Sequence, residues 1–155
     1  MIEGLTFIAF RHGDHNGNGL SPLGVEQIER AVQKIKEIWR RTDQKIILLC
    51  STAPRAIECG RIILALENLG MSIEHAIFTK DLWDDSGHFA EETKVNKLLD
   101  KNLLKNKIVL VVSHLDLVPC MLNYVATKFG HGEKYFSPEY GEGSIIDSEG
   151  VRAFP

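Results

Sequence analysis

The chain has 155 residues, of which 44% are hydrophobic and 25% charged, and its formal net charge is −3. This length and composition predict one globular domain that covers residues 1–155. The slightly acidic balance excludes a nucleic-acid binder that depends on overall positive charge, although a small basic pocket is compatible with it.

The cysteines and the N-terminal segment indicate a cytoplasmic protein. Cys50, Cys59 and Cys120 are odd in number and widely spaced, which matches neither a disulfide framework nor a zinc-finger pattern. The first residues lack the basic region and the long apolar run of a signal peptide. No stretch has the length of a membrane span. We therefore expect a reducing compartment and no membrane partner.

Strand-like and helix-like segments alternate along the chain. An apolar run at 5–10 predicts a first strand that is buried on both faces. Ser21 and Pro22 then mark the N-cap and first position of a helix whose apolar residues recur every three or four positions. The later predicted elements are a strand at 45–50, a helix at 54–69 that ends before Gly70, a strand at 72–78, a helix at 89–104, a strand at 108–113, a helix at 117–129 and a C-terminal hairpin at 143–154.

This order predicts an α/β fold: a three-layer sandwich with a mostly parallel central sheet, helices on both faces and an edge hairpin at the C-terminus. Ligands in such sheets bind beyond the carboxyl ends of the strands. The first strand ends in Arg11 and His12, the second leads to Arg55 on the next helix, and the fourth leads to His114. We expect these four side chains to meet at one edge of the sheet.

Two guanidinium groups and two imidazoles suit one kind of ligand. Arginine offers forked donors to phosphate oxygens, so the predicted pocket would hold a tetrahedral dianion. One imidazole can act as a nucleophile toward phosphorus, and the other can donate a hydrogen bond to the developing charge.

The motifs at these positions resemble the histidine phosphatase (phosphoglycerate mutase-like) superfamily. They are Arg-His-Gly after the first strand, an asparagine seven positions after its arginine, and the segments LSPLGVEQ, STAPRAIE and VVSHLDLV, in that order over nearly the whole chain. The short length, the RHGD segment and the SHLDLV segment are most similar to the bacterial phosphohistidine phosphatase branch.

The resemblance implies a role for each matched residue. His12 would be the nucleophile that becomes phosphohistidine, and Arg11, Arg55 and His114 would form the phosphate pocket. Asn18 matches a polar residue that often lines this pocket, and its alternative role is that of a turn former. The implied reaction has two steps, in which His12 takes the phosphoryl group and water then removes it. No metal or cofactor is implied, because the positive side chains stabilise the charge.

Other residues near the motifs have weaker assignments. The resemblance implies that Gly13 lets the backbone approach closely and that its carbonyl orients the His12 ring. Ser51 either caps the following helix, which we favour, or contacts phosphate. We expect Cys59 and Cys120 to be core residues on helix faces. The histidines for which we expect no catalytic role are His15, His75, His88 and His131.

The proton donor is the main departure from the family pattern. Many members carry a glutamate donor downstream of the second arginine, and here Asp84 stands at that offset with Asp85 beside it. Aspartate is shorter by one methylene, and the alternative is that both are solvated loop residues. A phosphohistidine substrate has a good leaving group and would need a donor less. The short stretch after Arg55 also leaves no room for a long lid, which predicts an open site.

Three functions are compatible with these residues. The first is a metal-independent phosphatase that acts on protein phosphohistidine or, alternatively, on small phosphomonoesters. The second is a non-catalytic phosphate-binding domain. The third is a metallohydrolase, but two adjacent arginines would repel a dication and its ligands lack a recognised spacing. The candidate ligands for that metal are His12, Asp14, His15, His114 and Asp116. The expected partner is a phosphorylated protein or small molecule, and the pattern predicts no oligomeric state.

Overall fold

One central sheet organises the fold. The structure is a computed structural model that describes residues 2–17 and 19–155. Six strands pair in the order β5–β4–β6–β1–β7–β8, and the first four run parallel while β7 and β8 are antiparallel. These strands are β1 (Thr6–Arg11), β4 (Lys45–Ser51), β5 (Ile73–Thr79), β6 (Lys107–Ser113), β7 (Gly143–Asp147) and β8 (Gly150–Phe154). The predicted edge hairpin is confirmed as β7–β8.

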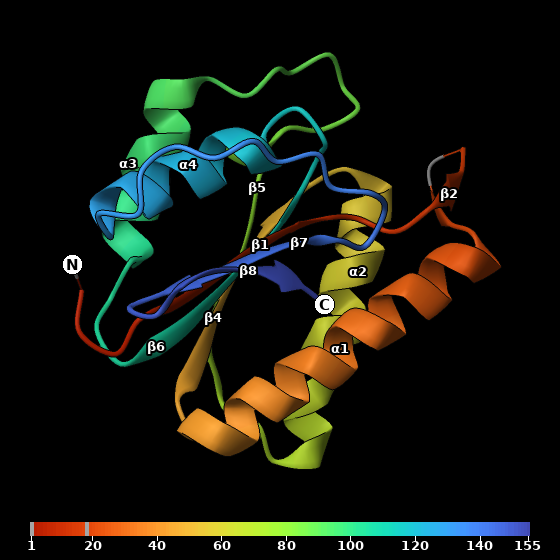
Figure 1. Ribbon diagram of the computed structural model, residues 1–155. Coiled ribbons are helices and arrows are strands. Elements are labelled where there is room, and N and C mark those ends of the chain that lie inside the picture. The colour runs from red at the N-terminus through yellow and green to blue at the C-terminus, as the bar shows by residue number, and fades with distance from the viewer. Residues whose placement is uncertain (1, 18) are drawn as a thin grey trace.

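Helices cover both faces of the sheet (Figure 1). On one face lie α1 and α2, and on the other lie α3 and α4. The helices are α1 (Pro22–Thr42), α2 (Pro54–Leu64), α3 (Glu92–Asn102) and α4 (Val118–Lys128), with short 3₁₀ turns η1 (Ala65–Leu69) and η2 (Lys80–Leu82). This arrangement confirms the predicted three-layer α/β fold. Among the helices that the structure describes, none is both long and apolar enough to cross a membrane.

The strand sequences explain why there are two cores. Along β1, Ile8 and Phe10 pack in the core beneath α1 and α2, whereas Phe7 and Ala9 pack in the core beneath α3 and α4. Successive side chains of a strand point to opposite faces, so a strand covered on both faces must be apolar throughout. The unbroken apolar runs of β1 and β6 are the consequence.

Several element boundaries differ from the predictions. The helix predicted at 54–69 is α-helical only to Leu64 and continues as η1 up to Gly70, whose φ of 86° ends it. The helix predicted at 89–104 spans only Glu92–Asn102. A small hairpin between β1 and α1 carried no periodic signal and was not predicted. Its strands are β2 (His15–Asn16) and β3 (Gly19–Leu20).

The two helical cysteines differ in burial. Cys59 is buried as predicted, but the prediction that Cys120 belongs to the core is wrong, because its side chain is exposed. The buried stripe of α4 runs through Val118, Met121 and Val125, and position 120 falls outside this stripe.

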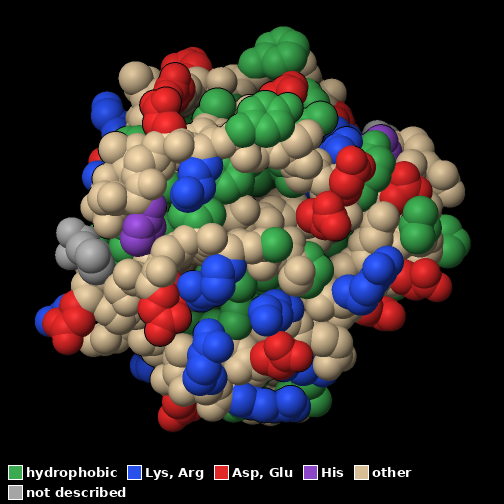
Figure 2. All heavy atoms as spheres, viewed as in Figure 1, with side chains coloured by type: hydrophobic (Ala, Val, Ile, Leu, Met, Phe, Trp, Pro, Cys, Tyr) green, Lys and Arg blue, Asp and Glu red, His purple; other side chains and the backbone are tan. Residues whose placement is uncertain are grey.

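Charge is unevenly distributed over the surface in Figure 2. Basic side chains lie mostly over the lower half of the view, where α1 runs. Hydrophobic and acidic side chains lie together at the top, near the loop between β5 and α3.

The loop after β1 is held against the first turn of α1. Ser21 caps α1 by accepting a hydrogen bond from the Gly24 N–H at 3.0 Å, and its hydroxyl donates to Asp14 at 2.6 Å. A Cβ added to Gly13 would lie 2.6 Å from the Gly24 carbonyl oxygen, and one added to Gly24 would clash with the Asp14 backbone. The close approach of two glycines therefore sets the position of His12, which lies between β1 and this contact.

Candidate active site

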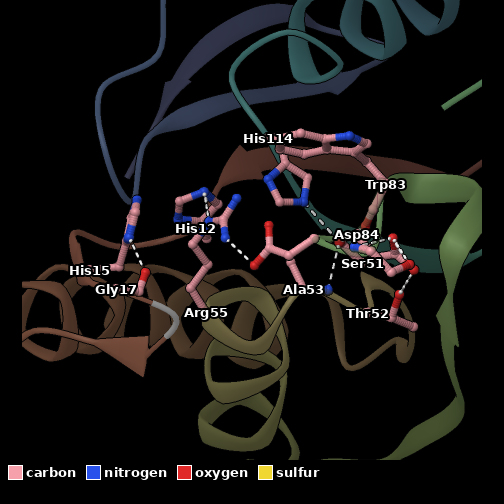
Figure 3. A network of polar contacts seen from close by, with 12 residues as sticks. His12, His15, Gly17, Ser51, Thr52, Ala53, Arg55, Trp83, Asp84 and His114 are labelled. Atoms are coloured by element: carbon pink, nitrogen blue, oxygen red, sulfur yellow. Dashed lines mark hydrogen bonds and ion pairs between the residues drawn. The ribbon is translucent and has the colours of Figure 1, made fainter. Parts of the chain in front are cut away.

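Three strand ends bring the predicted site residues together. In the parallel pair β1 and β6, Arg11 lies opposite Ser113, and the His12 N–H donates to the Ser113 carbonyl at 3.1 Å. The rings of His12 and His114 have centroids 5.1 Å apart. Arg55 lies on the first turn of α2, which follows β4, and its side chain reaches His12. We call Arg11, His12, Arg55 and His114 the arginine–histidine cluster, and Figure 3 shows the last three of them.

His12 is held as a neutral ring whose Nε2 carries no proton. Its Nδ1–H donates to the Gly13 carbonyl at 2.8 Å, and its Nε2 accepts a hydrogen bond from the Nε–H of Arg55 at 3.1 Å. Burial lowers the pKa of His12 to about 4, and the nearby charges of Arg55 and Arg11 act in the same direction. These contacts assign the proton to Nδ1 and leave the lone pair on Nε2.

His114 is held in the opposite tautomer. The Ser51 hydroxyl donates its only proton to the Trp83 carbonyl and accepts the Ala53 N–H at 3.1 Å. Its 2.8 Å contact with His114 must therefore use a proton on the His114 Nε2. Burial lowers the pKa of His114 to about 3, and His12 and Arg55 lower it further. The lone pair of His114 is consequently on Nδ1.

Two buried nitrogen atoms of the cluster have no partner among the described residues. They are Nε of Arg11 and Nδ1 of His114. Arg11 is positioned instead by Tyr140, because its guanidinium group lies 3.8 Å from the centre of that ring. The Tyr140 ring centroid is also 5.8 Å from that of His12. Buried polar groups are nearly always hydrogen-bonded, so these nitrogens indicate a place where a polar ligand would be bound.

Asp84 and Asp85 have different surroundings. Asp85 forms an ion pair with Nη1 of Arg55 at 2.6 Å. Asp84 is buried and accepts hydrogen bonds from Ser86, at 2.7 Å from the hydroxyl and 3.0 Å from the N–H. The Ser86 hydroxyl lowers the pKa of Asp84. In Figure 3, Asp84 lies on the side of Ser51 away from His12. Asp85 thus contacts the arginine–histidine cluster, whereas Asp84 has no contact with it among the described residues.

The overall architecture is shared with known phosphatases. A scan against protein-family models and a search of curated proteins both find no match to this chain. Among solved structures, a protein from Agrobacterium tumefaciens assigned as phosphohistidine phosphatase SixA has a TM-score of 0.60 at 16% identity, over 95% of this chain and 93% of that chain. A protein from Nakamurella multipartitia, also assigned as phosphohistidine phosphatase SixA, has a TM-score of 0.58 at 16% identity, over 94% of this chain and 86% of that chain. The alpha-ribazole phosphatase of Shigella flexneri has a TM-score of 0.55 at 15% identity, over 96% of this chain and 95% of that chain. The chain therefore shares its fold with these three proteins.

The predictions for Ser51 and Asn18 have different outcomes. The prediction that Ser51 caps the next helix is wrong, because Ala53 is the N-cap of α2 and no side chain caps it. The Ser51 hydroxyl instead holds His114, as described above. Asn18 lies outside the described residues, so its predicted contact with the phosphate pocket stays a prediction.

Two aromatic residues of the site were not found from the sequence. Trp83 has a φ of 81°, and its ring packs edge-on against His114 with centroids 4.1 Å apart. Tyr140 lies under Arg11 in the loop 130–143, and the next residue, Gly141, donates its N–H to the carbonyls of Arg11 and His12 at 3.0 Å. No periodicity marks either residue. The only signals in the sequence were their neighbours: Trp83 precedes the pair Asp84 and Asp85, and Tyr140 precedes Gly141.

The candidate metal ligands are not arranged as a metal site. Within residues 2–17 and 19–155, no group of three or more His, Cys, Asp or Glu side chains is placed to hold a metal ion. Asp14 accepts the hydroxyl of Ser21, and Asp116 is exposed. The five candidate ligands of the metallohydrolase alternative therefore do not form such a group within the described residues.

Proposed function

We propose that the chain is a metal-independent phosphatase that works through a phosphohistidine formed on His12. The observation that carries this proposal is the state of the His12 ring, whose Nδ1–H is donated to Gly13 and whose Nε2 lone pair faces Arg55. A neutral imidazole whose Nε2 is unprotonated suits nucleophilic attack on phosphorus once the Arg55 guanidinium group turns its donors from this nitrogen to the phosphate oxygens.

The reaction would proceed in two displacements at phosphorus. In the first, the Nε2 lone pair of His12 forms a bond to phosphorus, and the bond to the leaving group breaks with its electron pair. The Gly13 carbonyl stabilises the positive charge that the ring then carries, through Nδ1–H. In the second, the oxygen of water forms a bond to phosphorus, and the bond from His12 Nε2 to phosphorus breaks with its electron pair returning to Nε2. The protons of the water leave with inorganic phosphate, and His12 is again neutral. Arg11 and Arg55 bind the phosphoryl oxygens in both displacements.

For the substrate we propose a phosphohistidine side chain on a protein, with small phosphomonoesters as the alternative. A leaving imidazole needs little help from an acid, whereas an alkoxide needs a proton donor. The predicted donor, Asp84, is hydrogen-bonded to Ser86, which fits a reaction with little need of an acid. Rates should be compared on a phosphohistidine protein, a sugar phosphate and an aryl phosphate. Faster turnover of the sugar phosphate than of the phosphohistidine protein would favour a phosphomonoesterase.

The nucleophile is tested by the His12→Ala variant. Turnover should be abolished, and wild-type protein quenched during turnover should carry phosphate that is labile to acid and stable to base, which the variant lacks. His75→Ala, which removes an exposed histidine on β5, is the control and should retain both properties. Near-normal turnover by folded His12→Ala protein would refute the mechanism.

The rival functions are separated by inhibitors and by turnover itself. Vanadate or inorganic phosphate should compete with substrate, because both bind to the same two arginines. Excess chelator should leave the rate unchanged. Loss of activity with chelator and its return with a divalent ion would favour the metallohydrolase, and phosphate binding without turnover would favour the non-catalytic domain.

A further inference from the structure

A pocket adjoins the arginine–histidine cluster on the side of His114 that faces Trp83. It has a volume of about 230 Å³, which is less than the roughly 300 Å³ or more of a whole-ligand site, so it would take one part of a ligand. We call it the aromatic pocket. It is lined by Trp83, Phe89, Ala90, Glu92, His114, Asp116, Leu117 and Cys120.

The walls of the aromatic pocket combine aromatic faces with negative charge. The rings of Trp83 and Phe89 are stacked, with centroids 6.4 Å apart and planes inclined by 25°. Glu92 and Asp116 are exposed, and within the described part of the chain neither forms an ion pair. The lining itself contains no lysine or arginine, but the Arg55 guanidinium group already lies 5.7 Å from the centre of the Trp83 ring. The exposed Phe89 ring and the two carboxylates are therefore what the pocket offers to a further cation. Aromatic faces and carboxylates both attract cations, so this chemistry favours a positively charged organic group.

Trp83 is held in place at a conformational cost. Its φ of 81° is rare for a bulky residue, and such strain persists only where the surroundings enforce it. Its carbonyl accepts the Ser51 hydroxyl, and its ring packs against His114. Phe89, in contrast, is 75% exposed although it is a large hydrophobic residue. In Figure 2 hydrophobic and acidic side chains lie together near this loop. One wall of the pocket is therefore rigidly placed and the other is open to a ligand.

His114 connects the aromatic pocket to the reaction site. Its side chain is only 3% exposed, lines the pocket and carries an Nδ1 atom without a partner among the described residues. The ring centroid of His12 is 5.1 Å from that of His114. A ligand whose phosphoryl group meets His12 would thus have its organic part directed past His114 toward Trp83.

We propose that the aromatic pocket binds a positively charged organic group that the substrate carries next to its phosphoryl group. This inference rests on the proposed phosphatase function for its orientation. It adds substrate specificity to that function. The arginine–histidine cluster recognises the phosphoryl group, and the aromatic pocket selects substrates whose neighbouring group is cationic.

The test is the binding of two phosphonates that cannot be hydrolysed, measured by titration calorimetry. They are benzylphosphonates with a para-trimethylammonium or a para-carboxylate group. Wild-type protein should bind the cationic compound about tenfold more tightly, from its contact with aromatic faces and two carboxylates. The arginines would by themselves favour the more negative compound, so a preference for the cation has to come from the pocket.

Variants identify the origin of the preference. In the double variant Glu92→Gln/Asp116→Asn and in Phe89→Leu, the ratio of the two dissociation constants should fall several-fold toward one. Glu91→Gln is the matched control, because this neighbouring glutamate contacts Lys94 at 3.7 Å and does not line the pocket. It should keep the wild-type ratio.

Three outcomes would overturn the inference: equal binding of the two phosphonates, a preference for the carboxylate, or no detectable binding of either. Survival of the full ratio in the double variant would do the same. The proposed function fails separately, because it predicts a phosphohistidine on His12 whatever the ratio. Turnover without a cation preference would refute the aromatic pocket alone, and a cation preference without phosphohistidine would refute the phosphatase mechanism alone.

Discussion

Two buried neutral histidines should make the stability of this protein depend on pH. His12 and His114 are each 3% exposed, and burial lowers their pKa values from 6.5 to about 4 and about 3. Below pH 6.5 the unfolded chain therefore binds protons that the native protein does not. The free energy of unfolding then falls as the pH decreases through this window, and it is unaffected by these groups above about pH 7.

The size of the effect follows from the two pKa values. At pH 5 an unfolded histidine with a pKa of 6.5 is almost fully protonated, while His12 and His114 remain mostly neutral in the native protein. Each residue then costs about 2 kcal/mol of stability relative to pH 7.5. The pair should lower the free energy of unfolding by about 4 kcal/mol between pH 7.5 and pH 5, and His12→Ala should remove about half of this difference.

The assay is urea unfolding of each variant at pH 7.5 and pH 5, followed by tryptophan fluorescence. Truncation of His12 leaves a cavity at both pH values, so its cost cancels in the difference. His75→Ala serves as the control with an exposed histidine and should show the wild-type difference. If His12→Ala loses as much stability on acidification as the wild type, His12 is not held neutral by burial, and the assignment of its Nε2 lone pair is refuted.

Three further predictions concern catalysis. The acid limb of kcat/KM should lie near pH 4 rather than pH 6.5, because the proposed nucleophile is the neutral form of His12. A pH–rate profile on an aryl phosphate measures it. In steady-state kinetics, Asp85→Asn should raise KM several-fold because it releases Arg55, and Asp84→Asn should raise KM less. Equal effects of the two substitutions would contradict the different contacts of the two carboxylates. Ser51→Ala should slow turnover in the wild-type protein but have little effect in the His114→Ala variant, because Ser51 acts through His114. Additive effects in this double-mutant cycle would show that Ser51 acts independently of His114.

The convergence of the side chains in the arginine–histidine cluster could be predicted, because it follows from the parallel arrangement of the strands that carry them. Parallel strands place their carboxyl ends at one edge of a sheet, and β6 lies between β4 and β1. Arg11 and His114 follow two neighbouring strands, so their proximity requires no knowledge of loops. The same apolar runs that identify the strands also require helices on both faces, which is why the layers were predictable together with the site.

The contacts in the loop after β5 could not be predicted, because they depend on backbone torsions. Asp84 and Asp85 are adjacent, and spacing alone favoured the first as the residue nearer the chemistry. The positive φ of Trp83 turns the chain immediately before them, so that Asp85 reaches Arg55 and Asp84 turns to Ser86. A turn of this kind requires glycine in most proteins, and no glycine marks it here. Ser51 was misassigned for the same reason, since its partner is the Trp83 carbonyl.

The opposite tautomers of the two histidines are set by two neighbouring hydrogen-bond acceptors, one a backbone carbonyl and the other a side-chain hydroxyl. His12 donates its Nδ1–H to the Gly13 carbonyl and His114 donates its Nε2–H to the Ser51 hydroxyl, so each ring keeps a lone pair on its other nitrogen. A lone pair on His12 is what attack on phosphorus needs, but a lone pair on His114 would repel a phosphoryl oxygen. A bound dianion favours the charged form of a neighbouring imidazole and would raise the pKa of His114 from about 3. Binding of the proposed substrate would therefore be coupled to protonation of His114 at Nδ1, which converts the second histidine from a neutral acceptor into a donor only when phosphate is present.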